Sequence, residues 1–150
     1  METRVSKVSL FGVSRNALLL GRACALRDNP ILGIYDPDPQ RALQGALFLG
    51  VSARHTSQAL FADGPDVVLC SLPPSQVSSG ALLIRLGAQP DSPLGPNVCW
   101  ADAGPTEDSI PQEISNELPT LRLSLQGSDE AVERARRFLH SLSANIECRS

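Results

Sequence analysis

Residues 8–36 read VSLFGVSRNALLLGRACALRDNPILGIYD. In this stretch an apolar strand, a glycine turn, an Ala/Leu-rich helix and a second apolar strand that ends in an acid follow one another. This order is typical of a nucleotide-binding βαβ unit. The turn exposes backbone N–H groups at a helix N-terminus, where unpaired donors and the helix dipole favour a phosphate group. A plain βαβ unit without a ligand is the alternative that this segment alone leaves open.

The glycine fingerprint G-x-G-x-x-G is matched here by Gly12, Ser14 and Ala17. Gly12 suits a tight turn, and Ala17 is small enough for close packing of helix on sheet. Ser14 puts a hydroxyl where the backbone would approach a pyrophosphate, so a ligand must sit higher or gain a contact with it. Asp36 lies 24 positions after Gly12, near the spacing of about 20 expected for an acid that binds a ribose. The alternative for Asp36 is a turn aspartate before Pro37.

Composition limits the class of protein. The length of 150 residues fits one domain, residues 1–150, with a substantial core. A net charge of −3 and scattered arginines leave no basic stripe for nucleic acid. The apolar runs are short or interrupted by charge, and the N-terminal residues METRVSKVSL lack a signal-peptide pattern. We therefore expect a soluble, cytoplasmic protein that binds neither nucleic acid nor membrane.

The four cysteines, at positions 24, 70, 99 and 148, are far apart and form no C-x-x-C pair. Only two histidines are available to join them, so the sequence predicts no metal site. Reduced structural thiols are the interpretation that fits a cytoplasmic setting.

The middle of the chain predicts alternating helices and strands. A helix after Asp36 ends at Gly50, a short strand covers 51–53, and a helix begins at Thr56 or Ser57 and stops at Gly64-Pro65. The apolar run 66–72 suits a central parallel strand. The segment SQVSSGALLIRLG predicts another helix. The expected inward residues of the first and last of these helices are Ala42, Leu43, Ala46 and Leu47, and Val77, Ala81, Leu82 and Ile84.

The last third of the chain is expected to complete the sheet. NVCWA (97–101) reads as a strand, 111–117 as a short helical stretch, and residues 121–125 as a strand at a sheet edge with one wet face. A final helix is capped by Ser128, and a strand near 145–148 follows it.

Strands that alternate with helices predict an α/β fold: a doubly wound, mostly parallel Rossmann-type sheet in a three-layer αβα arrangement. Ligands of such folds bind past the carboxyl ends of the strands, at the topological switch point. This rule gathers four segments around one crevice, namely 12–16, 36–38, 71–74 and 102–104.

Several pieces in order carry a family resemblance: GVSRNALLLGRA, YDPDPQRA, LGVSA, PDVVLCSLPP and LRLSLQGSDEAVERARRFLHSL. Together they resemble the N-terminal NAD(P)-binding Rossmann domain of the β-hydroxyacid dehydrogenase and 6-phosphogluconate dehydrogenase superfamily. The resemblance implies an oxidoreductase-derived protein that binds a dinucleotide, with NAD favoured over NADP because Asp36 would repel a 2′-phosphate. Arg41 or Arg15 could weaken that preference. The implied contacts are the phosphates at Gly12, Val13, Ser14, Arg15 and Asn16, a ribose at Asp36, and the nicotinamide side at Leu72 and Pro73.

The resemblance fails at catalysis. The superfamily's catalytic lysine belongs to a C-terminal helical domain, whereas the single lysine here, Lys7, precedes the first strand. The D-x-P-x-S-G-G segment is also missing, and residues 102–105 are the nearest match. His55 and His140 are expected to be ordinary surface residues. The sequence therefore predicts no catalytic residue, and oxidoreductase activity would need a separate catalytic chain. A homodimer is the other assembly left open.

Other interpretations remain open. Gly12, Ser14 and Gly21 also resemble the G-x-S-(x)6-G turn of CoA-binding domains, which carry out no hydride chemistry, although YDPDP departs from that family's V-N-P. The segments YDPDPQRA and DVVLCSLPP are similar to the glucose–fructose oxidoreductase type, but Gln76 stands near where that family has a histidine. A degenerate Rossmann domain that acts as an interaction or regulatory partner is a further alternative.

Overall fold

The computed structural model describes residues 6–71, 81–86, 98–102, 121–142 and 146–149. The strands are β1 (Val8–Phe11), β2 (Ile31–Tyr35), β3 (Val67–Cys70), β4 (Leu82–Leu86), β5 (Val98–Asp102), β6 (Leu121–Gly127) and β7 (Ile146–Arg149). The helices are α1 (Arg15–Leu26), α2 (Pro39–Leu49), α3 (Ser57–Ala62) and α4 (Asp129–Leu142).

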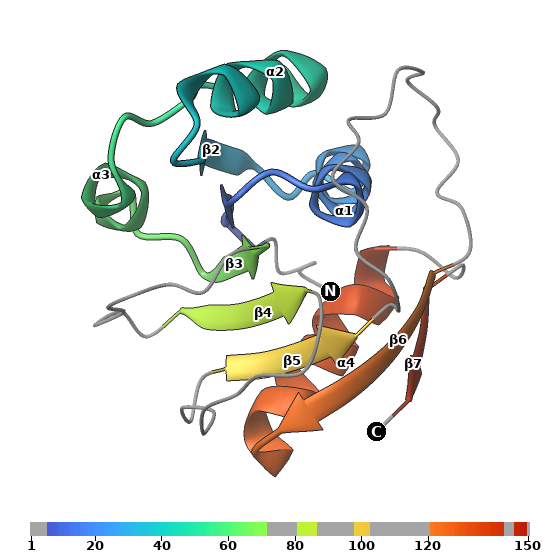
Figure 1. Cartoon of the computed structure of the whole chain (residues 1–150). Coiled ribbons are helices and arrows are strands. Elements are labelled where there is room, and N and C mark those ends of the chain that lie inside the picture. Colours follow the sequence, from blue (N-terminus) through green and yellow to red (C-terminus); the bar gives the residue numbers. More distant parts are fainter. Residues whose placement is uncertain (1–5, 72–80, 87–97, 103–120, 143–145, 150) are drawn as a thin grey trace.

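All the named strands form one sheet in the order β2-β1-β3-β4-β5-β6-β7 (Figure 1). The first five strands along the chain pair in parallel, β6 is antiparallel to β5, and β7 is parallel to β6. The strand order reverses on either side of β1, which makes the space between β1 and β3 the topological switch point. The structure thus confirms the doubly wound, mostly parallel Rossmann-type sheet.

Two cores lie on opposite faces of the sheet. The larger core joins α1, α2 and α4 to inward residues such as Leu10, Leu69 and Ile84. The smaller core contains Phe11, Leu60 and further residues next to α3. Successive residues Leu10 and Phe11 belong to different cores because side chains alternate across a strand. The αβα layering is therefore complete around β1, whereas no described helix covers β4 and β5 on the face opposite α4 (Figure 1).

The helix predicted for the segment SQVSSGALLIRLG is wrong. Its expected inward helix residues Leu82 and Ile84 lie in strand β4, which pairs in parallel with β3 and β5. Ala81 and four of the five β4 residues are buried. A short apolar run that is buried on both faces carries no periodicity that separates strand from helix. Val77 lies outside the described residues.

Three smaller predictions also need correction. In α2, Ala42 and Ala46 are buried as predicted, but Leu43 and Leu47 are 56% and 73% exposed, and Gly45 and Leu49 are buried in their place. β6 is not an edge strand, because β7 pairs with it. Residues 51–53 contribute only an isolated bridge between Ala53 and Ile34.

Helix starts follow their sequence signals. Ser14, Asp38, Thr56 and Ser128 each accept a hydrogen bond from a backbone N–H in the first turn of the following helix. Such caps satisfy donors that have no partner within the helix. The wet face of β6 and the final strand β7 are confirmed, while the predicted helical stretch 111–117 lies outside the described residues.

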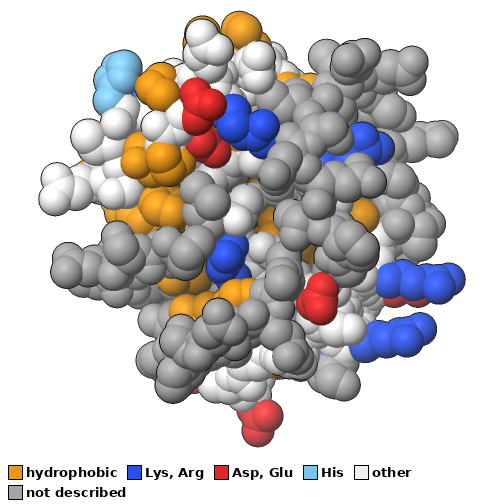
Figure 2. Space-filling view, viewed as in Figure 1, with side chains coloured by type: hydrophobic (Ala, Val, Ile, Leu, Met, Phe, Trp, Pro, Cys, Tyr) orange, Lys and Arg blue, Asp and Glu red, His pale blue; other side chains and the backbone are white. Residues whose placement is uncertain are grey.

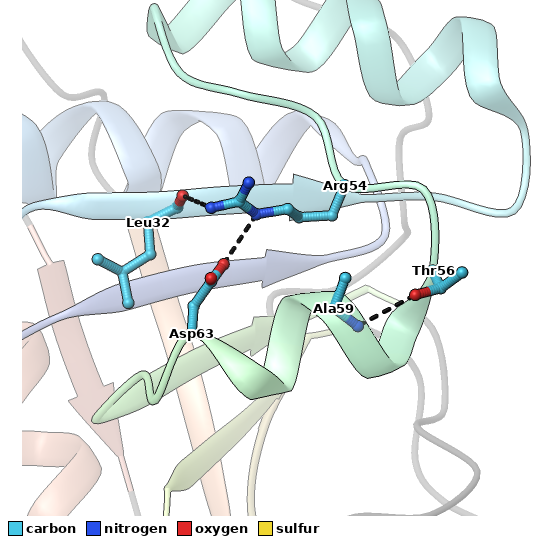
Figure 3. A network of polar contacts seen from close by, with 5 residues as sticks. All are labelled: Leu32, Arg54, Thr56, Ala59 and Asp63. Carbon is cyan, nitrogen blue, oxygen red and sulfur yellow. Dashed lines mark hydrogen bonds and ion pairs between the residues drawn. The ribbon is translucent and has the colours of Figure 1, made fainter.

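Arg54 ties the β2 edge to α3 (Figure 3). Its Nη2 donates to the Leu32 carbonyl at 3.3 Å, and its Nε pairs with Asp63 Oδ2 at 2.8 Å. The side chain lies across Gly33, where a Cβ atom would come within 2.9 Å of the Arg54 Nε. Arg54 therefore occupies space that a glycine in β2 leaves open, and it holds the segment between α2 and α3 against the sheet.

Candidate functional site

The glycine turn, residues Gly12–Ser14, lies at the carboxyl end of β1. Gly12 has a φ of 93°, which side-chain-bearing residues rarely adopt, and its N–H donates to the Tyr35 carbonyl at 2.6 Å. This bond joins the turn to the end of β2. The turn therefore lies where the crevice of a doubly wound sheet is expected.

Asp36 connects the end of β2 to the glycine turn. Its Oδ2 accepts from the Val13 N–H at 2.9 Å, and its Oδ1 accepts from the Asp38 N–H at 2.9 Å. The second contact makes Asp36 a turn aspartate, as the alternative interpretation predicts, while the first brings it to the glycine turn. Each carboxylate oxygen has a further lone pair, so the same group can still accept from a hydroxyl.

Ser14 is the N-cap of α1, and the residue is 2% exposed. Its Oγ accepts from the Ala17 N–H at 3.2 Å and lies 2.7 Å from the Oγ of Ser71, the residue after β3. The hydroxyl predicted to face a ligand is therefore already engaged between β1 and β3. Ser71, which is half-buried, is the hydroxyl nearer the surface.

Val13 is held from three sides. The residue is 4% exposed, and its Cγ2 lies 3.1 Å from where a Cβ on Gly45 of α2 would stand. Its carbonyl accepts from Arg41 Nη2 at 2.9 Å. Arg41, in the first turn of α2, thereby brings a guanidinium to the same turn that Asp36 binds.

The other predicted contacts fall into two groups. Arg15 and Asn16 are half-buried in the first turn of α1, directly after the glycine turn. Leu72 and Pro73 lie outside the described residues. The structure thus brings Gly12–Asn16, Asp36 and Ser71 together at one end of β1, β2 and β3.

Gly21 has a structural explanation of its own. A Cβ at this position would lie 3.1 Å from Leu49 Cδ1 of α2 and 3.5 Å from Leu10 Cδ1 of β1. Close packing of α1 therefore favours glycine there, whichever ligand the turn binds. The second glycine of the G-x-S-(x)6-G pattern consequently does not discriminate a CoA site from a dinucleotide site.

Among the described residues, no lysine lies at this end of the sheet, and neither histidine is buried. Lys7 precedes β1, and its backbone pairs with Asp66 at the opposite end of the strands. His55 and His140 are exposed, one in the segment before α3 and one on α4. Within the described residues no three His, Cys, Asp or Glu side chains are grouped to hold a metal ion.

The cysteines are free thiols in this structure, and three of them are buried. Burial raises the pKa of Cys24 and of Cys70 to about 12, and that of Cys99 to about 11. Burial also raises the pKa of the half-buried Cys148. Thiols held protonated in this way are poor nucleophiles at neutral pH.

The described helices include none that is both long and apolar enough to cross a membrane. The space-filling view shows both charge signs and apolar side chains scattered between the undescribed atoms on the visible face (Figure 2).

Comparisons with known proteins agree with this architecture. No protein-family model matches the chain, and no curated protein sequence matches it. Among solved structures, the chain is similar to a prephenate dehydrogenase from A. aeolicus in complex with hydroxyphenyl propionate and NAD+, with a TM-score of 0.72 and 14% identity. That match covers 100% of this chain and 62% of the dehydrogenase.

Two further structures have TM-scores of 0.63. One is an imine reductase variant from Myxococcus stipitatus in complex with NAD+, at 16% identity, covering 95% of this chain and 53% of that protein. The other is a (S)-3-hydroxybutyryl-CoA dehydrogenase from Ralstonia eutropha, at 10% identity, covering 97% and 57%. The chain thus spans little more than half the length of these proteins, and the likeness confirms the fold.

Proposed function

We propose that this chain binds a nicotinamide dinucleotide at the glycine turn and prefers NAD to NADP. The observation that carries the proposal is the junction of Gly12, Val13 and Asp36, where a carboxylate at the end of β2 touches the turn that begins α1. A ribose hydroxyl that donates to Asp36 would lie beside the Val13 N–H, which donates to the same carboxylate. The pyrophosphate would lie against the N-terminal turn of α1.

The rest of the dinucleotide would extend across the switch point between β1 and β3. Ser71 lies on that route, since its hydroxyl contacts Ser14 at the start of α1. Leu72 and Pro73, which follow Ser71 in sequence, are proposed to contact the nicotinamide side. The NAD+ complexes of similarly folded proteins support this choice of ligand.

Arg41 sets a condition on the cofactor preference. Its guanidinium binds the Val13 carbonyl beside Asp36, close enough to the proposed ribose to attract a 2′-phosphate. The carboxylate repels that phosphate and the guanidinium attracts it. We infer that NAD binds more tightly and that NADP binding is weakened rather than abolished.

Catalysis is proposed to require groups from outside this polypeptide. The described part of the site offers a binding surface and no paired acid, base or nucleophile. The chain would supply the nucleotide-binding part of an oxidoreductase, and a further segment or a separate chain would supply the substrate pocket. We expect no robust NADH formation by the 150-residue chain with 2- or 3-hydroxy acids.

A scaffold without a ligand is the second candidate. The Val13 N–H and the Ser14 hydroxyl both have partners within the protein, so the site is satisfied as it stands. A degenerate domain of this kind would serve as an interaction or regulatory partner. The proposed dinucleotide must compete with, or add to, these internal bonds.

Calorimetric titration of the purified chain with NAD+, NADP+ and acetyl-CoA separates these candidates. We expect saturable NAD+ binding and weaker NADP+ binding. Asp36→Ala should weaken NAD+ binding by about tenfold or more, because a hydrogen bond to a charged group contributes about 1.5–3 kcal/mol.

Asp38→Asn is the matched control, since it alters a neighbouring acid whose side chain caps α2 through the Gln40 N–H and makes no hydrogen bond to the glycine turn. It should leave the affinity unchanged. A heat of binding with acetyl-CoA but not with NAD+ or NADP+ would overturn the dinucleotide proposal in favour of a CoA-binding module. No heat of binding with any of the ligands would favour the scaffold without a ligand.

A further inference from the structure

Arg85 is a charged residue inside the otherwise apolar strand β4. Leu82, Ile84 and Leu86 belong to the core beneath α1 and α4, whereas Leu83 belongs to the smaller core on the opposite face. Alternation along the strand puts Arg85 on the same face as Leu83. This is the face on which no described helix covers β4 and β5.

The Arg85 side chain is held in one position by its neighbours. Its Nη1 donates to the carbonyls of Cys70 at 3.3 Å and Leu86 at 3.2 Å, the last residues of β3 and β4. Its guanidinium carbon lies 5.1 Å from the centroid of the Trp100 ring on β5, a cation–π distance. The guanidinium is thus fixed near the carboxyl ends of β3 and β4.

One edge of this guanidinium meets no acceptor in the part of the chain that the structure describes. The Nε atom is buried without a hydrogen-bond partner, and Nη2 has none among the described residues. Nε and Nη2 form the edge that binds an oxyanion through two parallel hydrogen bonds. Within the described residues no carboxylate lies within 4.0 Å of Arg85 to balance its charge. A half-buried cation in this condition favours an anionic partner.

The position of Arg85 relates it to the crevice. The Cys70 carbonyl that it binds belongs to the residue before Ser71, whose hydroxyl contacts Ser14 at the start of α1. The carboxyl ends of β1, β3 and β4 therefore carry a continuous series of polar contacts, from the cap of α1 to the guanidinium. A ligand that reaches past Ser71 toward β4 would approach Arg85.

We propose that Arg85 binds an oxyanion, the carboxylate or phosphate of a small ligand, through its Nε–Nη2 edge. The Cys70 and Leu86 carbonyls and the Trp100 ring hold the guanidinium in place for this contact. The site goes beyond the proposed function because it requires no dinucleotide, and small anions alone can test it.

Trp100 is the chain's single tryptophan, so its fluorescence reports on this site directly. We would titrate the full chain with sodium phosphate and, separately, sodium acetate, against sodium chloride at matched ionic strength. Saturation by phosphate or by acetate identifies which oxyanion is preferred, and either result supports the site. A response equal to that of chloride with both anions would overturn it.

Arg85→Gln should weaken the saturable response at least tenfold. Arg122→Gln is the control, because Arg122 on β6 is an exposed arginine paired with Glu147 and should respond as the wild type does. Equal responses of Arg85→Gln and the wild type would contradict the proposal. This result is expected if a carboxylate of the chain itself already neutralises Arg85.

A wild-type measurement keeps the test independent of the variant's folding. The Arg85 Nε–H resonance, assigned by its loss in Arg85→Lys, should shift with the saturating anion and not with chloride. An unmoved resonance would count against the site. Since neither measurement uses NAD+, the oxyanion proposal and the dinucleotide proposal can each be refuted without affecting the other.

Discussion

The two halves of the sheet are built differently. Around β1, β2 and β3, helices lie on both faces, and backbone and side-chain polar groups meet at one end of the strands. Around β4, β5 and β6, the described helix α4 covers one face, and the charged Arg85 lies on the other. The first half therefore carries the proposed nucleotide site, whereas the second half packs against it through a shared core.

That shared core gives the largest expected effect. Leu18 of α1 and Leu139 of α4 are both fully buried in the larger core, which spans the two halves. Each Leu→Ala change should lower the free energy of unfolding by about 2–5 kcal/mol. Urea unfolding followed by Trp100 fluorescence and by far-UV circular dichroism should give coincident curves for both variants. Separate transitions would show that the halves fold independently and that residues 1–150 are not one domain.

Buried thiols in both halves predict a loss of stability at high pH. Burial raises the pKa of Cys24 in α1 to about 12 and that of Cys99 in β5 to about 11, from an ordinary value of 9.0. Because the pKa values of these thiols are raised in the folded state, their protonated form stabilises the fold fully below pH 9.0. This contribution to the free energy of unfolding is lost as the pH rises toward 11–12. Each such thiol would contribute a slope of up to about 1.4 kcal/mol per pH unit.

Urea midpoints measured across this pH range check the prediction. Cys24→Ala should show a shallower decline above pH 9.0 than the wild type does. Identical slopes for the two proteins would contradict the burial of that thiol.

Two arginine contacts provide a smaller and more local comparison. Arg54 in the first half is about one-third exposed, contacts the Leu32 carbonyl and Asp63, and lies over Gly33. Arg122 in the second half pairs with Glu147, and both side chains are more than half exposed. Arg54→Ala should cost about 1–2 kcal/mol through lost packing and hydrogen bonds. Arg122→Ala should cost less than about 0.5 kcal/mol.

Thermal unfolding of both variants side by side tests this ranking. If Arg122→Ala proves as costly as Arg54→Ala, the β6–β7 pair is more tightly built than its exposure indicates.

Signals that act within a few residues were readable from the sequence. The caps Ser14 and Ser128 and the acid Asp36 lie where the local pattern placed them, because a cap or a turn needs only neighbouring backbone. Alternation of Leu121, Leu123 and Leu125 with polar residues likewise gave β6 and its wet face. The order of these elements was sufficient to predict the Rossmann-type sheet.

Features that depend on distant partners were not readable in the same way. The apolar run of β4 became a strand through its pairing with β3 and β5, and β6 became an interior strand through β7. The Ser14–Ser71 contact joins residues that lie 57 positions apart. The position of Arg85 inside the apolar run ALLIRLG is unusual and could have marked it as a candidate site residue. Its partners on the neighbouring strands, Cys70 and Trp100, become visible only when the sheet is assembled.

The most direct test of the nucleotide site is an amide chemical-shift map recorded while NAD+ is added to the ¹⁵N-labelled chain. We expect the largest changes in the amide resonances of Gly12, Val13 and the first turn of α1, with smaller shifts at Asp36 and Ser71. Amides of β6 and β7 should stay in place. Unchanged resonances at the glycine turn under saturating NAD+, or changes confined to the second half, would contradict the proposed nucleotide site.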